Sequence, residues 1–276
     1  MPTFKSFDAF DTFSEAVRFE RRFAHNSECV RFLDDVRRSA KSRTLRRGHP
    51  LWRAQIGHGT GMEPISLSED DESDYINIEV DAPFEAGRMS PDRRFVLDGR
   101  LNPRGIAYLY LAMDEPTAIA EVRPWLGADV SVGVFEVLRD CKIVDCSGPQ
   151  NHGFLFGIAG DGSPIDPPEG EWDEIVWGRV SHAFAVPTDP HDSNLTYVPT
   201  QIIAEVIREA GYDGIAYQSA MHWGGKNVAL FDASSANLFA CELKRVRKIE
   251  YSCTTSGRVY MRPRLTETPP ATPASK

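Results

Sequence analysis

The stretch from Gly99 to Trp125 constrains the fold most, because a basic loop, an apolar strand and a helix follow one another there without a break. Proline and glycine interrupt the loop, so Arg100, Asn102 and Arg104 lie on a turn, where cationic and amide groups can hold a phosphate. Residues 106–112 are apolar and aromatic and predict a strand buried on both faces.

The helix that follows carries a carboxylate toward the strand. Asp114 is a suitable N-cap, and Thr117, Glu121 and Trp125 share one helical face at intervals of four residues. This spacing places Glu121 near the strand end that carries Tyr110. Two interpretations stay open at this point, a solvated glutamate on a helix surface and a carboxylate with a chemical role.

Two distant segments bear on that choice. Residues 51–54 read Leu-Trp-Arg-Ala, and an arginine such as Arg53 within an apolar strand needs an anion or a carboxylate to offset its desolvation. Residues 212–219 predict a helix exit, a strand and then Ser219 at the strand end. A glycine-rich loop and another apolar strand follow at 224–231.

An arginine, a glutamate and a serine in this order, each at a strand end or helix start, resemble the RES domain family, which is named for those three residues. Any one matching segment is weak, but six in the right order are fairly specific, and they cover most of the chain from about residue 49 to 232. The segments are LWRA around Arg53, GRLNPRG, YLYLA, TAIAE ending at Glu121, DGIAYQS ending at Ser219, and GGKNVALF.

The resemblance implies an ADP-ribosyltransferase-like fold, an α/β (α+β) domain with two small sheets enclosing an NAD cleft. Known RES proteins are mostly bacterial toxins that consume NAD, and many are neutralised by a partner antitoxin, here expected to be of the Xre type. Some break NAD with phosphate or water as acceptor, and others have been linked to protein ADP-ribosylation. NAD is therefore the expected substrate, and no metal is expected.

The resemblance also implies site residues. Arg53, Tyr110, Glu121 and Ser219 fall on the family's active-site positions. Arg100 falls in the family's GRWN-like loop, where this chain has leucine at the usual tryptophan position, a departure that bears on the stacking contact of that loop.

Each residue then has an expected role. Cleavage of the nicotinamide-ribose bond builds positive charge on the ribose, and Glu121 held against the 2′-hydroxyl would stabilise it. Arg53, together with Arg100, would neutralise the pyrophosphate. Tyr110 offers an aromatic face to the nicotinamide or its ribose. Hydrogen bonds complete the set: the Ser219 hydroxyl would orient the ring or the carboxylate, and Asn227 would add an amide contact.

Composition excludes several other classes. A net charge of −9 and a pI near 5.3 argue against a broad nucleic-acid-binding surface. No apolar stretch is long enough to cross a bilayer and the N-terminus lacks the apolar core of a signal peptide, so a cytoplasmic protein without membrane contact is expected. Five cysteines without CxxC spacing and histidines without an HExxH pattern indicate neither disulfides nor a metal centre.

The chain divides into three predicted segments. Residues 1–48 form an N-terminal helical extension, with helices over 7–24 and 27–41, ahead of the catalytic domain. That domain spans 49–252, with insertions near 62–94 and 150–195, and the remaining segment, 253–276, is expected to be disordered from about residue 266.

Further patterns predict local structure. Residues 130–146 alternate in polarity and predict a hairpin or two strands, and 199–210 predict an amphipathic helix that ends at Gly211. A basic run over 37–47 indicates a charged helix end and linker, which the acidic tract at 69–74 could oppose.

Several functions stay open on the sequence alone. The favoured one is a toxin-like enzyme that cleaves NAD, and a protein ADP-ribosyltransferase would use the same residues. A glycosidase would pair Glu121 with a second acid such as Asp213 at about 5 to 10 Å. A non-catalytic module that binds NAD or ADP-ribose is the remaining alternative. The acceptor, the antitoxin and the oligomeric state cannot be read from the sequence.

Overall fold

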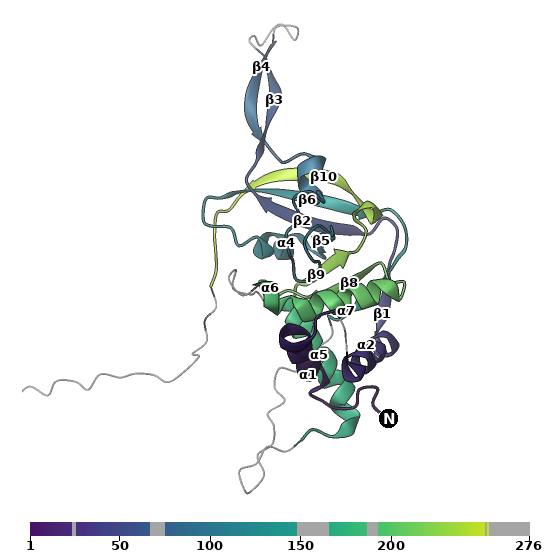
Figure 1. Ribbon diagram of the computed structural model, residues 1–276. Helices are drawn as coiled ribbons and strands as arrows, with labels where there is room; N and C mark the ends of the chain where they lie inside the picture. Colours follow the sequence, from purple (N-terminus) through teal and green to yellow (C-terminus); the bar gives the residue numbers. More distant parts are fainter. Residues whose placement is uncertain (24–25, 67–74, 148–165, 187–192, 252, 254–276) are drawn as a thin grey trace, which may run out of the picture.

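The computed structural model describes residues 1–23, 26–66, 75–147, 166–186, 193–251 and 253 (Figure 1). It shows a mixed α/β architecture, which confirms the predicted class. The acidic tract at 69–74, part of the insertion expected near 150–195 and the tail from 266 lie outside the described residues. Within the described part of the chain, no helix has the length and apolar character needed to span a membrane.

Eight strands form one large sheet in the order β1-β7-β8-β9-β5-β2-β6-β10. All neighbouring strands run antiparallel except β7 and β8, which are parallel. In chain order the strands are β1 (Ser42–Leu45), β2 (Pro50–Ile56), β5 (Leu109–Ala112), β6 (Asp129–Val137), β7 (Cys141–Asp145), β8 (Gly214–Gln218), β9 (Lys226–Leu230) and β10 (Ala236–Arg245).

The large sheet is nearly divided between β5 and β2. These two strands share a single register pair, Trp52 with Ala112, whereas β5 pairs with β9 over four residues. Ala112 is the last residue of β5, and the chain turns away into a helix soon afterwards, so the ladder to β2 cannot extend. Where the family resemblance implied two small sheets, the structure has one large sheet that is nearly divided into two halves.

A separate two-stranded sheet projects from the molecule (Figure 1). It consists of β3 (Gly59–Ser66) and β4 (Tyr75–Ala82), which pair antiparallel. The short helix α3 (Ala86–Met89) follows and is anchored by Met89, which is fully buried. The segment 62–94, predicted as an insertion, thus contains most of this hairpin and α3.

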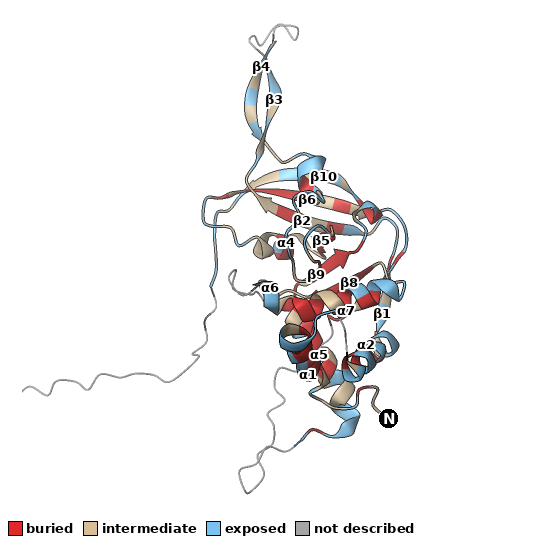
Figure 2. Ribbon diagram, viewed as in Figure 1, coloured by how far each residue is buried: buried red, intermediate tan, exposed pale blue. Residues whose placement is uncertain are grey.

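Helices gather against the β7-β8 side of the sheet (Figure 1). Buried side chains from the N-terminal helices, from two later helices and from β8 form one hydrophobic core, so the N-terminal segment packs on the rest of the chain. Figure 2 shows this buried layer between the helices and the sheet. In chain order, and apart from α3, the helices of the described residues have the following bounds: α1 (Ala9–Glu15), the π-helical η1 (Ala16–Glu20), α2 (Ser27–Ser39), α4 (Glu115–Glu121), η2 (Glu169–Glu171), α5 (Trp172–Ala185), α6 (Ser193–Thr196), α7 (Val198–Glu209) and η3 (Ala233–Ser235).

Helix α7 confirms the amphipathic helix predicted over 199–210. Gly211 follows its end with φ +85°, a conformation that glycine adopts without steric cost. The amide of Gly211 donates to the Arg208 carbonyl, and that of Tyr212 donates to the Ile207 carbonyl. This arrangement is a Schellman motif, which satisfies the last carbonyls of the helix.

Two other local predictions differ in detail. The segment 130–146 forms two strands, but β6 pairs with β2 and β10 while β7 pairs with β1 and β8, so they do not form a hairpin. The helix predicted over 7–24 is shorter, since α1 and η1 together span residues 9–20. In the basic run at 37–47, four arginines form ion pairs, for example Arg46 with Asp140 at 2.7 Å, and residues 42–45 of the predicted linker form β1.

Candidate active site

A cavity of about 320 Å³ opens where β5 and β2 diverge. It is the place where the two halves of the sheet part, so side chains from both halves and from α4 point into one space. Five of the six predicted site residues line it, and the sixth, Ser219, contacts a lining residue. The five are Arg53, Arg100, Tyr110, Glu121 and Asn227.

Glu121 lies at the end of α4, at the wall of the cavity. The Asp114 side chain caps the helix start by accepting from the Thr117 amide at 2.8 Å, as predicted. The helix ends sooner than predicted, because Arg123 has φ +48° and precedes a proline, which disfavours helical backbone. Trp125 therefore does not continue the Glu121 face, and it is 63% exposed.

The carboxylate of Glu121 is held by two side chains from the other end of the sequence. The Ser219 hydroxyl donates to its Oε1 at 2.7 Å, and Asn227 Nδ2 donates to the same oxygen at 2.6 Å. Asn227 is a buried residue of β9, and Ser219 follows β8. Two hydrogen bonds to one oxygen hold the carboxylate in a single orientation.

The loop after Ser219 fixes the direction of its proton. The amides of Met221 and His222 both donate to Ser219 Oγ at 3.1 Å. A hydroxyl has two acceptor positions and one proton, so these amides leave the proton for Glu121. Gly225 closes the loop, and a Cβ there would lie 2.3 Å from Thr117 Oγ1, so only glycine fits.

Arg100 faces the second carboxylate oxygen. Its guanidinium lies 3.7 Å from Glu121 Oε2, and both side chains are largely buried. Burial acts to lower the pKa of Arg100, but the side chains of Tyr217 and Glu121 outweigh it, so the pKa is raised. Burial raises the pKa of Tyr217 to about 12, which keeps its phenol neutral and able to donate a hydrogen bond.

Tyr110 anchors the loop that carries Arg100. Its hydroxyl donates to Asn102 Oδ1 at 2.7 Å and accepts from the Leu101 amide at 3.1 Å. The amide group of Asn102 also donates to loop carbonyls, so this buried side chain is committed to the loop and is not free to hold a phosphate. Leu101 is fully buried in the main core, which shows that the residue at the family's tryptophan position serves packing here. Arg104 is exposed and does not line the cavity.

Arg53 spans the division in the sheet. Its NH1 donates to the main-chain carbonyl of Tyr110 at 3.0 Å, which links β2 to β5 beyond their one register pair. Its Nε is buried and has no hydrogen-bond partner. Burial lowers the pKa of Arg53, and the nearby charge of Arg88 lowers it further. No carboxylate pairs with this guanidinium among the described residues.

Three aromatic residues of the cavity wall were missed by the sequence reasoning: Trp52, Tyr197 and Tyr217. Tyr217 had a usable signal, because it precedes Ser219 by two residues and side chains at that spacing share one face of a strand. Tyr197 lies at the start of α7, where the sequence gives no periodic signal.

The structure separates the two acids that a glycosidase would need. Asp213 and Ser219 flank opposite ends of β8, and six residue steps along a strand amount to roughly 20 Å. Asp213 is instead bound by Arg139 and by the Lys142 amide, both at 2.7 Å. It does not line the cavity, so its proposed pairing with Glu121 is wrong. Across the residues that the structure describes, no three histidine, cysteine or acidic side chains gather as metal ligands do.

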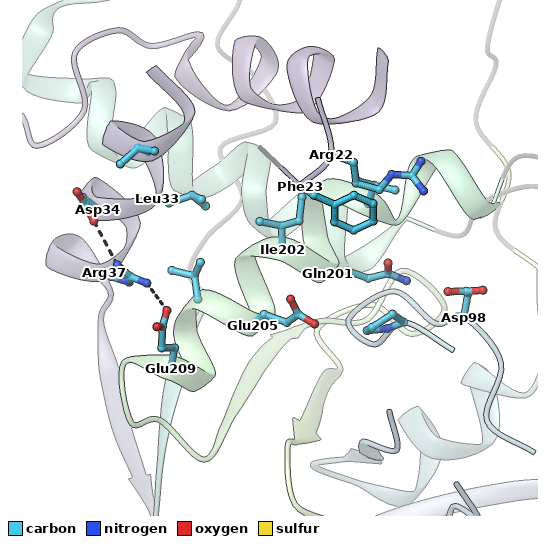
Figure 3. A pocket seen from close by; sticks show the side chains of 14 residues that line it. Arg22, Phe23, Leu33, Asp34, Arg37, Asp98, Gln201, Ile202, Glu205 and Glu209 are labelled. Atoms are coloured by element: carbon cyan, nitrogen blue, oxygen red, sulfur yellow. Dashed lines mark hydrogen bonds and ion pairs between the residues drawn. The ribbon is translucent and has the colours of Figure 1, made fainter. Parts of the chain in front are cut away.

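A larger groove of about 900 Å³ lies between α2 and α7 (Figure 3). Arg37 pairs with Asp34 and Glu209 on its wall. Gln201 on its floor donates Nε2 to the Gly99 carbonyl, so the groove borders the rear of the loop that carries Arg100. None of the predicted site residues lines it.

Comparison with known proteins identifies one family. The model of the RES domain matches residues 71–253. No curated protein matches the sequence. A solved chain from the "Crystal structure of the M.tuberculosis MbcT-MbcA toxin-antitoxin complex" is similar at 12% identity, with a TM-score of 0.36, and the match covers 78% of this chain and 91% of that one. A similarity of that size supports no functional inference.

Proposed function

Because the chain belongs to the RES domain family, we propose that it is a toxin-like enzyme that cleaves the nicotinamide-ribose bond of NAD with phosphate or water as acceptor. The observation that carries the proposal is the fixed carboxylate of Glu121, which two donors hold at a cavity that also contains two arginines. A solvated glutamate on a helix surface would have neither the donors nor the cavity.

The chemistry follows from the charge that develops in the reaction. As the bond between ribose C1′ and the nicotinamide nitrogen breaks, its electron pair moves to the ring and the ribose becomes oxocarbenium-like. The carboxylate of Glu121 would accept a hydrogen bond from the ribose 2′-hydroxyl and stabilise that cation. Its Oε2 is the oxygen available for this contact, because Ser219 and Asn227 already donate to Oε1.

The acceptor then adds to C1′. Water would give ADP-ribose, nicotinamide and a proton, whereas inorganic phosphate would give ADP-ribose 1″-phosphate and nicotinamide. A protein side chain as acceptor would make the chain a protein ADP-ribosyltransferase, with the same bond broken.

The remaining groups suit the rest of the substrate. Arg53 carries a buried Nε without a partner, and Arg100 lies beside the carboxylate, so both offer donors to the pyrophosphate. Tyr110, Tyr197 and Tyr217 supply aromatic surface for the nicotinamide and its ribose. The volume of about 320 Å³ is at the lower end for ligand sites and suits the nicotinamide riboside half of NAD. An antitoxin partner and the toxin role rest on the family resemblance.

The decisive experiment is incubation of the purified chain with NAD, with and without phosphate, followed by chromatography of the products. We expect release of nicotinamide, with ADP-ribose in plain buffer or its phosphorylated form when phosphate is the acceptor. ADP-ribose transferred to added protein would identify the transferase alternative. Binding of NAD without nicotinamide release would identify a non-catalytic module and contradict the proposal.

A further inference from the structure

A second cavity, of about 470 Å³, adjoins the candidate active site. Arg53, Gly99 and Tyr110 line both cavities, so the two spaces meet along these three residues. The rest of the second cavity comes largely from the segment around α3, which lies in the region predicted as an insertion. The RES domain model also covers this segment, because its match begins at residue 71.

Arg88 of α3 is the second cation of this cavity. Its position is fixed by the buried Met89 next to it and by its own main-chain carbonyl, which accepts from Gln55 Nε2 at 2.9 Å. Its guanidinium lies over the Phe84 ring at 5.3 Å from the centroid. Within the described part of the chain, Arg88 has no acidic partner.

The charge of the cavity is not neutralised by its own wall. Asp92 is the only acid among the lining residues, and Arg94 binds its carboxylate through two donors at 2.6 and 3.1 Å. That contact lowers the pKa of Asp92 to about 2. Arg53 and Arg88 therefore face the cavity without a counter-charge.

We propose that Arg53 and Arg88 form a phosphate subsite in this cavity, beside the active-site carboxylate. Arg53 is largely buried and Arg88 is exposed, and both line the cavity without an acidic partner among the described residues, so a phosphate there would supply the missing counter-charge. A planar guanidinium can donate two parallel hydrogen bonds to two oxygens of one phosphate, which an ammonium group cannot do. Phe95 and Leu97 add exposed apolar surface at the edge of the same cavity.

Two sources can supply the phosphate, and both rest on the proposed function. One is the pyrophosphate of NAD, whose adenosine half would extend into the second cavity. The other is the inorganic phosphate that attacks the ribose. The subsite itself depends on neither, because it is inferred from the unpaired cations.

Binding of inorganic phosphate and pyrophosphate, measured by calorimetry, tests the subsite without reference to catalysis. We expect Arg88→Gln to weaken binding of at least one probe by about ten- to a hundredfold, the effect of losing a charged hydrogen-bonding partner. Arg88→Lys should recover only part of the loss. Arg93→Gln is the matched control, since Arg93 is exposed on the same segment and does not line the cavity, and it should change binding less than about twofold.

Steady-state kinetics then separate the two sources. A raised KM for NAD in Arg88→Gln, with the KM for phosphate unchanged, assigns the subsite to the pyrophosphate, and the reverse assigns it to the acceptor. Unchanged binding of both probes in Arg88→Gln, or equal weakening by Arg93→Gln, would overturn the subsite. A wild-type protein that binds phosphate through Arg88 but releases no nicotinamide would contradict the proposed function alone.

Discussion

The Ser219 hydroxyl donates its only proton to Glu121 Oε1 across 2.7 Å, while two main-chain amides occupy its acceptor positions. The serine is thus a fixed donor that cannot rotate toward another acceptor without leaving an amide unpaired. This contact joins a helix end to a loop 98 residues further along the chain, and it defines the orientation of the carboxylate.

Glu121→Gln should preserve the fold and abolish most NAD cleavage, because the amide is nearly isosteric but lacks the negative charge. Loss of one such transition-state contact lowers the rate by about 10² to 10³. Nicotinamide release under single-turnover conditions measures the effect. Glu115→Gln on the same helix is the control, since Glu115 pairs with Lys244 away from the cavity and should retain wild-type turnover. Normal turnover in Glu121→Gln would refute the role of this carboxylate.

Ser219→Ala and Asn227→Ala should each lower kcat by about tenfold, since each removes one donor to Glu121 Oε1, worth about 1.5 kcal/mol. Both donors hold the same oxygen, so the double variant should lose less than the product of the two effects. A double-mutant cycle on kcat, with melting temperatures recorded beside it, checks this. Strictly multiplicative losses would show that the two residues act independently.

Arg53→Lys should weaken NAD binding by about tenfold and also lower the stability of the protein by about 1 kcal/mol. The substitution removes the planar guanidinium and its hydrogen bond to the Tyr110 carbonyl. Titration with NAD and urea denaturation measure the two effects separately. Arg93→Lys, at an exposed position, should change neither. Equal NAD affinities for both variants would leave Arg53 with a structural role only.

Gly99→Ala should disrupt the Arg100 loop, because a Cβ at this position would lie 2.4 Å from Asn102 Oδ1 and 2.9 Å from the Tyr110 hydroxyl. We expect a loss of about 1 to 3 kcal/mol in unfolding free energy together with reduced activity. Gly178→Ala, in the middle of α5 with open space around the added carbon, should instead stabilise by roughly 0.5 to 1 kcal/mol. Chemical denaturation of the pair decides whether packing at Gly99 is as tight as the structure shows.

Expression in bacteria tests the proposed function in cells. If the chain turns over NAD, induction should drain the NAD pool before growth stops, and Glu121→Gln should be harmless. Timed NAD measurements beside growth curves provide the readout. Growth arrest with an undiminished pool would contradict NAD degradation and favour modification of a protein target, because labelling a protein consumes little NAD.

The sequence predicted the local setting of the candidate site residues better than the sheet that carries them. Spacing and residue type placed Arg53 in a strand, Asp114 at a helix start and Ser219 at a strand end, and the structure has each of these. Such features are local, since they depend on capping, side-chain alternation and turn chemistry. The convergence of Glu121 with Ser219 and Asn227 came from the family resemblance, because no local rule reports contacts across more than 90 residues.

The features of the site that the sequence did not predict depend on long-range packing. Asn102 appears in the sequence as an exposed amide on a turn, but Tyr110 recruits it into the loop interior, a contact visible only once strand and loop are folded together. The second cavity was missed for a similar reason. Arg88 lies outside the six sequence segments that carry the family resemblance, and only the fold brings it to the same cavity as Arg53.

The Arg53 side chain links β2 to β5 at the point where the backbone pairing of these two strands ends. Under the proposed function, selection for a stable fold and selection for a functional cleft act on the same guanidinium. A descendant of this protein that lost its chemistry but still had to fold would be expected to retain the arginine, whereas Glu121 would be free to drift. Persistence of Arg53 without Glu121 would accordingly mark an inherited framework, and only the two together would mark an inherited activity.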